Sequence, residues 1–66
     1  MRQYDPEAWY VETWYVSGVH TGYRVMRGFG LAMEIAEGFT GDTYKPGSFE
    51  RALKSANSLR DKLNIA

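Results

Sequence analysis

The chain has 66 residues, 15% of them aromatic, and its eight basic and eight acidic side chains leave no formal net charge. This length predicts a single domain (1–66), and the balanced charge lacks the basic excess with which nucleic-acid-binding modules attract phosphate. The absence of cysteine excludes disulfides and thiolate metal sites, one histidine excludes a histidine-rich metal site, and no apolar run reaches the roughly 18 residues that a membrane span needs.

The first half of the chain predicts two strands. Residues 1–8 are polar and are expected to form a lead-in, and residues 9–16 (WYVETWYV) have the β-branched and aromatic composition of a strand. Residues 17–22 form a connection with a glycine near each end, and residues 23–27 (YRVMR) alternate apolar and polar side chains. Two strands joined in this way indicate an antiparallel hairpin, although a connection longer than two residues does not define the register.

Residues 31–39 (LAMEIAEGF) support two predictions. Their Leu, Ala, Met and Glu content favours a helix, whereas their alternation favours a strand with Leu31, Met33 and Ile35 on one face. No Ser, Thr, Asp or Asn stands just before Leu31 to cap a helix. The strand is the preferred prediction, and the helix stays open as the alternative.

The last third of the chain predicts a loop and a helix. Residues 40–47 (TGDTYKPG) carry the glycines, aspartate and proline of a loop, and Ser48 is the expected N-cap of a helix over 48–63. Its apolar residues recur at helical spacing and draw one stripe, which consists of Phe49, Ala52, Leu53, Ala56, Leu59 and Leu63. The polar residues between them should be solvated.

These elements predict an α+β domain with a small three-stranded antiparallel sheet (9–39) and one C-terminal helix packed on one face, in the order β-β-β-α. If residues 31–39 are helical, the order becomes β-β-α-α. Either architecture has two layers, so a sheet face is left without a helix.

A five-residue aromatic repeat lies in the first strand, as Trp9-Tyr10-Val11 and Trp14-Tyr15-Val16. Because side chains alternate faces with period two, the odd interval places Trp9 and Trp14 on opposite faces of an unbroken strand. A β-bulge near Glu12-Thr13 would instead bring both tryptophans to one face.

The odd-numbered strand residues carry no charge up to Met26, and they are expected to lie under the helix stripe together with Leu31, Met33 and Ile35. The even-numbered residues are then expected to form the open face, where Glu12 and Glu34 add negative charge. Aromatic, methionine and arginine side chains together are enriched at interface cores. The predicted partner-binding residues are Tyr10, Trp14, Arg24 and Met26. A cation–π pair is expected between Arg24 and Trp14.

Catalysis has little support in the sequence. His20 stands alone in a connection with glycines at its ends and is expected to be solvated. The run Gly28-Phe29-Gly30 begins like a dinucleotide-binding loop, but Met33 stands where the third glycine belongs, so a turn is predicted. No catalytic residues, cofactor, metal or small-molecule substrate are expected, and the chain is not predicted to be an enzyme.

The leading hypothesis is a non-catalytic protein-binding module that acts through its aromatic sheet face. The partner would be a second copy of the chain or a larger enzyme that this protein regulates or inhibits, by analogy of size and style with phage-encoded modulators. The alternative is a nucleic-acid-binding domain that uses the three-stranded sheet. The absence of signal-peptide and membrane-span patterns leaves the cytoplasm as the expected location, without a membrane partner. The nucleic-acid platform would comprise Tyr10, Trp14, Arg24 and Arg27, with Lys45 at its edge.

Overall fold

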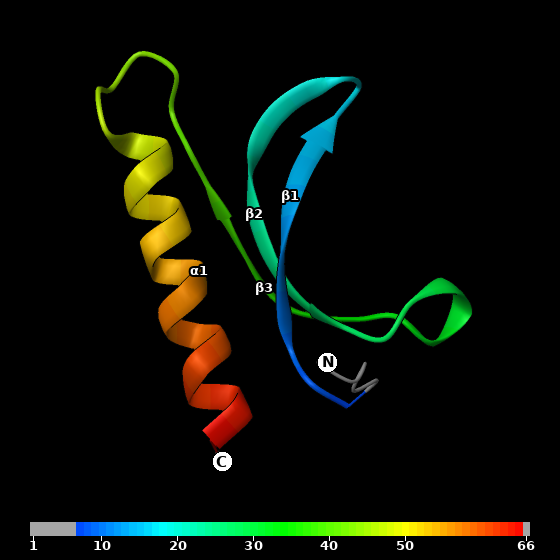
Figure 1. Cartoon of the computed structure of the whole chain (residues 1–66). Helices are drawn as coiled ribbons and strands as arrows, with labels where there is room; N and C mark the ends of the chain where they lie inside the picture. Colours follow the sequence, from blue (N-terminus) through cyan, green and yellow to red (C-terminus); the bar gives the residue numbers. More distant parts are fainter. Residues whose placement is uncertain (1–6, 66) are drawn as a thin grey trace, which may run out of the picture.

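The computed structural model describes residues 7–65, so most of the predicted lead-in lies outside the described residues. The three strands form one antiparallel sheet in the order β1-β2-β3, and the helix packs against it (Figure 1). This confirms the predicted α+β fold in the order β-β-β-α. The elements are β1 (Tyr10–Val16), β2 (Val19–Arg27), the 3₁₀ turn η1 (Gly30–Ala32), β3 (Glu34–Thr40) and α1 (Ser48–Ile65).

The β1–β2 hairpin is tighter than the sequence predicts. Its turn consists of Ser17 and Gly18 with φ angles of 51° and 78°, and two consecutive positive φ angles are typical of a type I′ turn. The predicted connection over 17–22 is therefore wrong, because β2 already begins at Val19. Gly22 belongs to the strand, where the Phe39 carbonyl oxygen leaves no room for a side chain.

The register of β1 decides the question of the tryptophan repeat. Residues 10–14 pair without interruption with residues 26–22 of β2, so no bulge occurs near Glu12-Thr13. The register shifts only after Trp14, where Thr21 is an extra residue on β2. The alternation of faces therefore holds along β1 as far as Trp14.

A second register shift changes the faces of β3. Val25 pairs with Glu37 and the next residue, Met26, pairs with Ile35, so Ala36 is an extra residue on β3. The shift places Ile35 on the face of Met26 and moves Glu34 to the opposite face, beside Arg27. The predictions of Ile35 under the helix and of Glu34 on the open face are both wrong for this reason.

The segment 31–39, for which the sequence predicted a strand, contains a 3₁₀ turn, a short connection and a strand. Its second part is strand β3, as preferred, whereas Leu31 lies in η1 and Met33 in the connection that follows. Gly28 and Gly30 have φ angles of 76° and 63°, which a residue with a Cβ rarely adopts. These two glycines reverse the chain before β3 begins, and neither Leu31 nor Met33 therefore lies beneath α1.

Helix α1 extends two residues beyond the predicted end at 63, and no residue of its apolar stripe is exposed. The predicted N-cap is wrong, because Ser48 is already helical and the Gly47 carbonyl accepts the first helical bond from the Arg51 N–H at 3.1 Å. The Ser48 hydroxyl instead accepts a bond from the Asp42 N–H at 2.7 Å. Within the described residues, no helix combines the length and apolarity that crossing a membrane requires.

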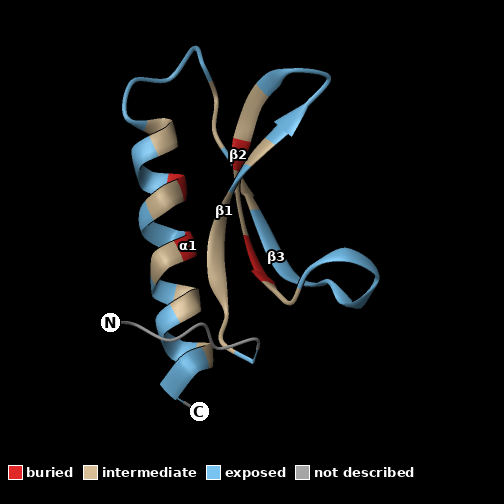
Figure 2. Ribbon diagram, turned by 45° about the vertical axis from the view of Figure 1, so that its right-hand side comes forward, coloured by how far each residue is buried: buried red, intermediate tan, exposed pale blue. Residues whose placement is uncertain are grey.

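The core lies on both sides of the central strand. Val25 and Met26 are consecutive residues of β2, they point to opposite faces, and both are 0% exposed. The other buried side chains in the described range are Ala52 and Ala56 of α1, whereas β3 is almost wholly exposed (Figure 2). The face without a helix must therefore be covered by side chains of the sheet itself.

Candidate interaction surfaces

The four predicted partner-binding residues lie on one face of the sheet, which we call the Trp14 face and define as Tyr10, Glu12, Trp14, Arg24 and Met26. The uninterrupted pairing of Tyr10 with Met26 and of Glu12 with Arg24 places them together. The sequence thus predicted correctly that these residues share a face, and the structure does not test whether they bind a partner.

Trp14 lies across the sheet and is half-buried. The Arg24 guanidinium carbon is 5.3 Å from the centroid of the indole ring, which confirms the predicted cation–π pair. The ring extends from β1 as far as β3, where a Cβ on Gly38 would stand 3.0 Å from Trp14 Cζ3. Trp14 therefore uses its ring to join all three strands.

The other members of the Trp14 face are also engaged within the chain. Met26 is 0% exposed, because the face on which it lies is closed over it, so its side chain lies beneath the surface that a partner would meet. The Tyr10 hydroxyl donates to the Gly28 carbonyl oxygen at 2.8 Å. Arg24 Nε is buried and has no hydrogen-bond partner within residues 7–65, although Glu12 pairs with Arg24 in the register. The face is thus mostly a covered layer.

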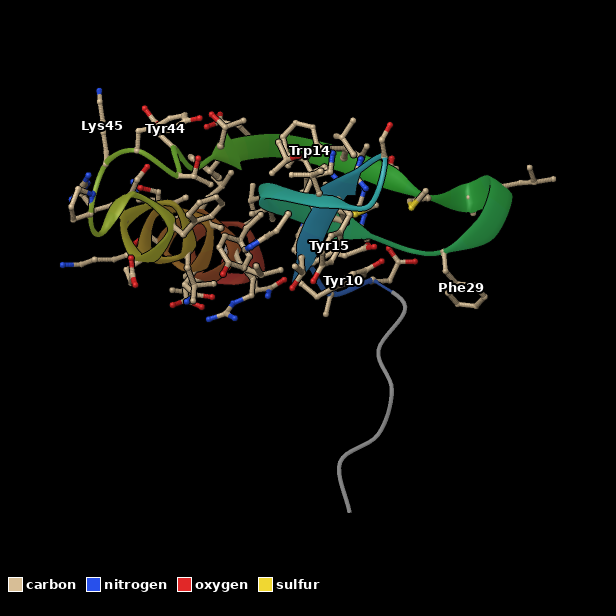
Figure 3. All side chains as sticks on the ribbon, turned by 90° about the horizontal axis from the view of Figure 1, so that it is seen from above. Tyr10, Trp14, Tyr15, Phe29, Tyr44 and Lys45 are labelled. Atoms are coloured by element: carbon tan, nitrogen blue, oxygen red, sulfur yellow. The ribbon has the colours of Figure 1, made fainter. Side chains whose placement is uncertain are left out.

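Four of the nine large exposed apolar side chains of the described residues lie instead on the connection between β2 and β3, and a smaller group, Tyr15, Val16 and Val19, flanks the β1–β2 turn. We call residues 28–35 the β2–β3 projection, since this segment extends from the sheet away from α1 (Figures 1 and 2). Figure 3 shows Phe29 at the end of the molecule opposite Tyr44 and Lys45. The exposed members of the projection are Phe29, Leu31, Met33 and Ile35.

The projection continues into the Trp14 face, because Ile35 pairs with Met26 and Met26 pairs with Tyr10. Sequence analysis missed this surface, since simple alternation assigned Leu31, Met33 and Ile35 to the covered face. The signal that could have found it is the pair of glycines at 28 and 30, which mark a chain reversal inside the apolar run.

A charged pair stands at the base of the projection. Arg27 lies over the Trp9 ring at 4.5 Å from the centroid and donates from Nε to Glu34 Oε2 at 2.7 Å. Both side chains of this ion pair are partly exposed, so the pair adds little stability. It does, however, compensate the positive charge of Arg27. A cavity of about 360 Å³ opens beside them, and its lining consists of Glu7, Arg27, Gly28, Phe29, Ala32 and Glu34.

Trp9 links the start of the sheet to the end of the helix through its main chain. The Trp9 N–H donates to Asn64 Oδ1 at 2.7 Å, and Asn64 Nδ2 donates to the Trp9 carbonyl oxygen at 2.9 Å. The half-buried Trp9 ring lies against Arg27, which follows Met26 on β2 and therefore points to the face opposite Trp14, as predicted for Trp9. The first tryptophan of the repeat therefore connects the two layers, and the second joins the strands.

His20 is not a solvated loop residue, as the sequence predicted, but a half-buried member of β2. Its ring stacks on Phe49 at a centroid distance of 4.7 Å and meets the edge of Tyr23 at 5.2 Å. Tyr15 approaches at 5.5 Å, and the Gly22 carbonyl oxygen lies 3.2 Å from His20 Nε2. This cluster fixes the hairpin to the first turn of α1.

The described residues offer no arrangement typical of a metal site. Within residues 7–65, no three His, Cys, Asp or Glu side chains lie close enough together to hold a metal ion. Comparison of the chain with protein-family models, with curated proteins and with solved structures finds no match. The candidate functional features of the molecule are therefore the exposed surfaces described above.

Proposed function

We propose that this protein is a non-catalytic protein-binding module whose main contact surface is the β2–β3 projection. The observation that supports this proposal is the concentration of four large exposed apolar side chains within one short segment. Leu31 is fully exposed at the tip, and nothing within residues 7–65 shields it from water. Exposed apolar residues that are contiguous, rather than scattered, mark interaction sites.

The composition of the projection favours a protein partner over nucleic acid. Its one charged residue is Glu34, and the neighbouring Arg27 is occupied by that carboxylate and by Trp9. Arg24 lies beneath Trp14, and Lys45 is at the far end of the molecule (Figure 3). A nucleic-acid platform needs free cations along the surface that meets phosphate, so this alternative has less support.

The partner that fits the projection is a protein with an apolar groove, into which a narrow loop inserts its side chains. A small module of this kind can regulate or inhibit a larger enzyme by occupying such a groove, as the analogy with phage-encoded modulators suggests. The Trp14 face would then support the projection and contribute the exposed edge of Tyr10 to the contact. A cytoplasmic location stays a prediction from the sequence.

The test begins with a photo-crosslinking amino acid at position 31, with position 65 as the matched control. Leu31 and Ile65 are both exposed aliphatic residues, but Ile65 lies at the end of α1. The partner captured through position 31 is purified, and its affinity is measured by calorimetry. We expect Leu31→Asp to weaken binding at least tenfold, about 1.4 kcal/mol or more, while Ile65→Asp leaves it unchanged.

Two results would contradict the proposal. The first is that Leu31→Asp binds the partner with the wild-type affinity, whereas Trp14→Ala stays folded but no longer binds it. The other is salt-sensitive binding of single- or double-stranded DNA or RNA, which would favour the nucleic-acid alternative.

A further inference from the structure

Strand β3 has an open outer edge. The Gly41 N–H donates to the Thr21 carbonyl oxygen at 2.9 Å, which continues the register that pairs Thr40 with Gly22 and Gly38 with Arg24. Hydrogen-bonded and non-hydrogen-bonded pairs alternate along an antiparallel ladder. The N–H and C=O groups of Gly38 and Thr40 therefore point away from β2, toward the position of a fourth strand.

The helix lies closer to this edge of the sheet than to the other edge. Helix α1 packs mainly on β2, and it contacts β3 more than β1. A groove of about 400 Å³ lies between α1 and β3, with lysines on the helix side and an apolar floor. The residues that line it are Glu37, Phe39, Lys54, Ser55, Ser58, Leu59 and Lys62. A strand added to β3 would place alternate side chains in this groove.

The sequence of β3 is self-complementary in one antiparallel register. With a two-fold axis at Gly38, the two glycines face each other and Glu37 of one copy faces Phe39 of the other. An axis at Glu37 would set like charges directly opposite, which is destabilising. An axis at Phe39 would leave only the end of the strand to pair. An axis at Ala36 would pair as many residues but would be centred on the bulge. The register centred on Gly38 pairs residues 36–40 without a charge conflict and keeps the bulge away from the axis.

We infer that a second copy of this chain pairs with β3 through this register and forms a continuous six-stranded sheet with both helices on the same face. Each copy sends Glu37 toward the groove of the other, where it meets Lys54 and Lys62. Pairing satisfies the outward backbone groups of an edge strand, which are otherwise a liability. It also adds burial to a domain that has few buried side chains.

The Trp14 face also suits this arrangement. The indole ring of Trp14 already reaches Gly38, which has no side chain to lift the ring from the edge strand. Since the axis passes through Gly38, the rings of the two copies approach each other above the paired glycines. In the dimer, the covered layer of the Trp14 face therefore continues from one copy to the other across the two-fold axis.

Strand β1 is the other edge of the sheet, but it lacks this cover. The helix contacts β1 least, so a strand added there would have no helix above it. The start of β1 is also tied to α1 by the bonds between Trp9 and Asn64. The dimer surface is separate from the β2–β3 projection, and this inference therefore stands or fails independently of the proposed function.

Amide hydrogen exchange over a range of protein concentrations tests the inference. We expect the Gly38 and Thr40 amides to exchange at least tenfold more slowly at 1 mM than at 1 μM protein. The Thr13 amide is the internal control, because Thr13 pairs with Tyr23 and its N–H points away from β2 on the opposite edge. Its exchange should not depend on concentration. A strict monomer at 1 mM by sedimentation equilibrium would overturn the inference.

Matched proline variants locate the edge. Thr40→Pro and Thr13→Pro each remove an outward N–H that the chain's own ladder does not use. Thr40→Pro should give a folded monomer by circular dichroism, while Thr13→Pro stays dimeric. If Thr40→Pro fails to fold, Glu37→Lys replaces it, because this exposed residue would then repel the lysines of the groove and weaken the dimer at least tenfold. Dissociation by Thr13→Pro alone, or no effect of Glu37→Lys, would overturn the inference.

Discussion

The Trp14 face and the β2–β3 projection have similar apolar side chains but different surroundings. On the Trp14 face, the indole lies over Arg24 and Gly38, and Met26 is 0% exposed. On the projection, Leu31 is fully exposed and Met33 is 46% exposed. Aromatic content alone therefore does not mark a binding surface in a small domain. The better indicator is how far side chains from neighbouring strands cover the apolar residues.

A sheet face without a helix can be closed by long side chains from neighbouring strands. Cross-strand contacts of this kind stabilise a sheet, and they account for the burial of Met26 on the uncovered side. The tip of the projection lies beyond this layer, because the glycines at 28 and 30 reverse the chain there, and Leu31 and Met33 are exposed. Its exposed side chains are therefore available to another molecule.

The largest difference in the free energy of unfolding is expected when a methionine is replaced by alanine in each of the two regions. Met26→Ala should lower the free energy of unfolding by about 2–4 kcal/mol, because it removes a fully buried side chain from a small core. Met33→Ala on the projection should change it by no more than about 0.5 kcal/mol. Urea denaturation followed by circular dichroism measures both values. Equal losses would mean that the two regions do not differ.

A smaller effect is expected at Gly38. Gly38→Ala should destabilise the protein by about 1 kcal/mol, because the new Cβ would stand 3.0 Å from Trp14 Cζ3 and displace the ring. In a Trp14→Ala background this loss should disappear, so a double-mutant cycle isolates the contact. Additive effects of the two substitutions would show that the ring does not rest on Gly38.

The smallest effect on stability is expected at the tip of the projection. Leu31→Asp should leave the free energy of unfolding within about 0.5 kcal/mol of the wild-type value, because Leu31 is fully exposed. The same urea titration provides the measurement. A loss above 1 kcal/mol would mean that Leu31 packs against the protein, and the projection would then lose its role as a free surface.

Much of the fold could be predicted from local patterns. The aromatic and β-branched composition of β1 and the helical spacing of Ala52 and Ala56 predicted a strand and a covered helix face, as observed. The two-residue turn at Ser17-Gly18 was not predicted, because His20 and the glycines near it have the composition of a longer loop. Only the pairing of the strands shows that these residues extend β2.

The candidate surface was less predictable, because it depends on one extra residue. The bulge at Ala36 reverses the faces of β3, and nothing in the alternation of Leu31, Met33 and Ile35 signals it. A bulge is set by how two strands pair, which a single strand's sequence does not contain. The burial of Met26 likewise depends on side chains from neighbouring strands.

Trp14 joins the three strands and is expected to stabilise the sheet, whereas the projection is the surface that we propose for partner binding. The most direct test is the free energy of unfolding of Trp14→Ala, measured by urea denaturation with circular dichroism. We predict a loss of about 2 kcal/mol, below the value for a fully buried tryptophan because Trp14 is half-buried. An unchanged unfolding midpoint would contradict the account, since Trp14 would then be a free surface residue.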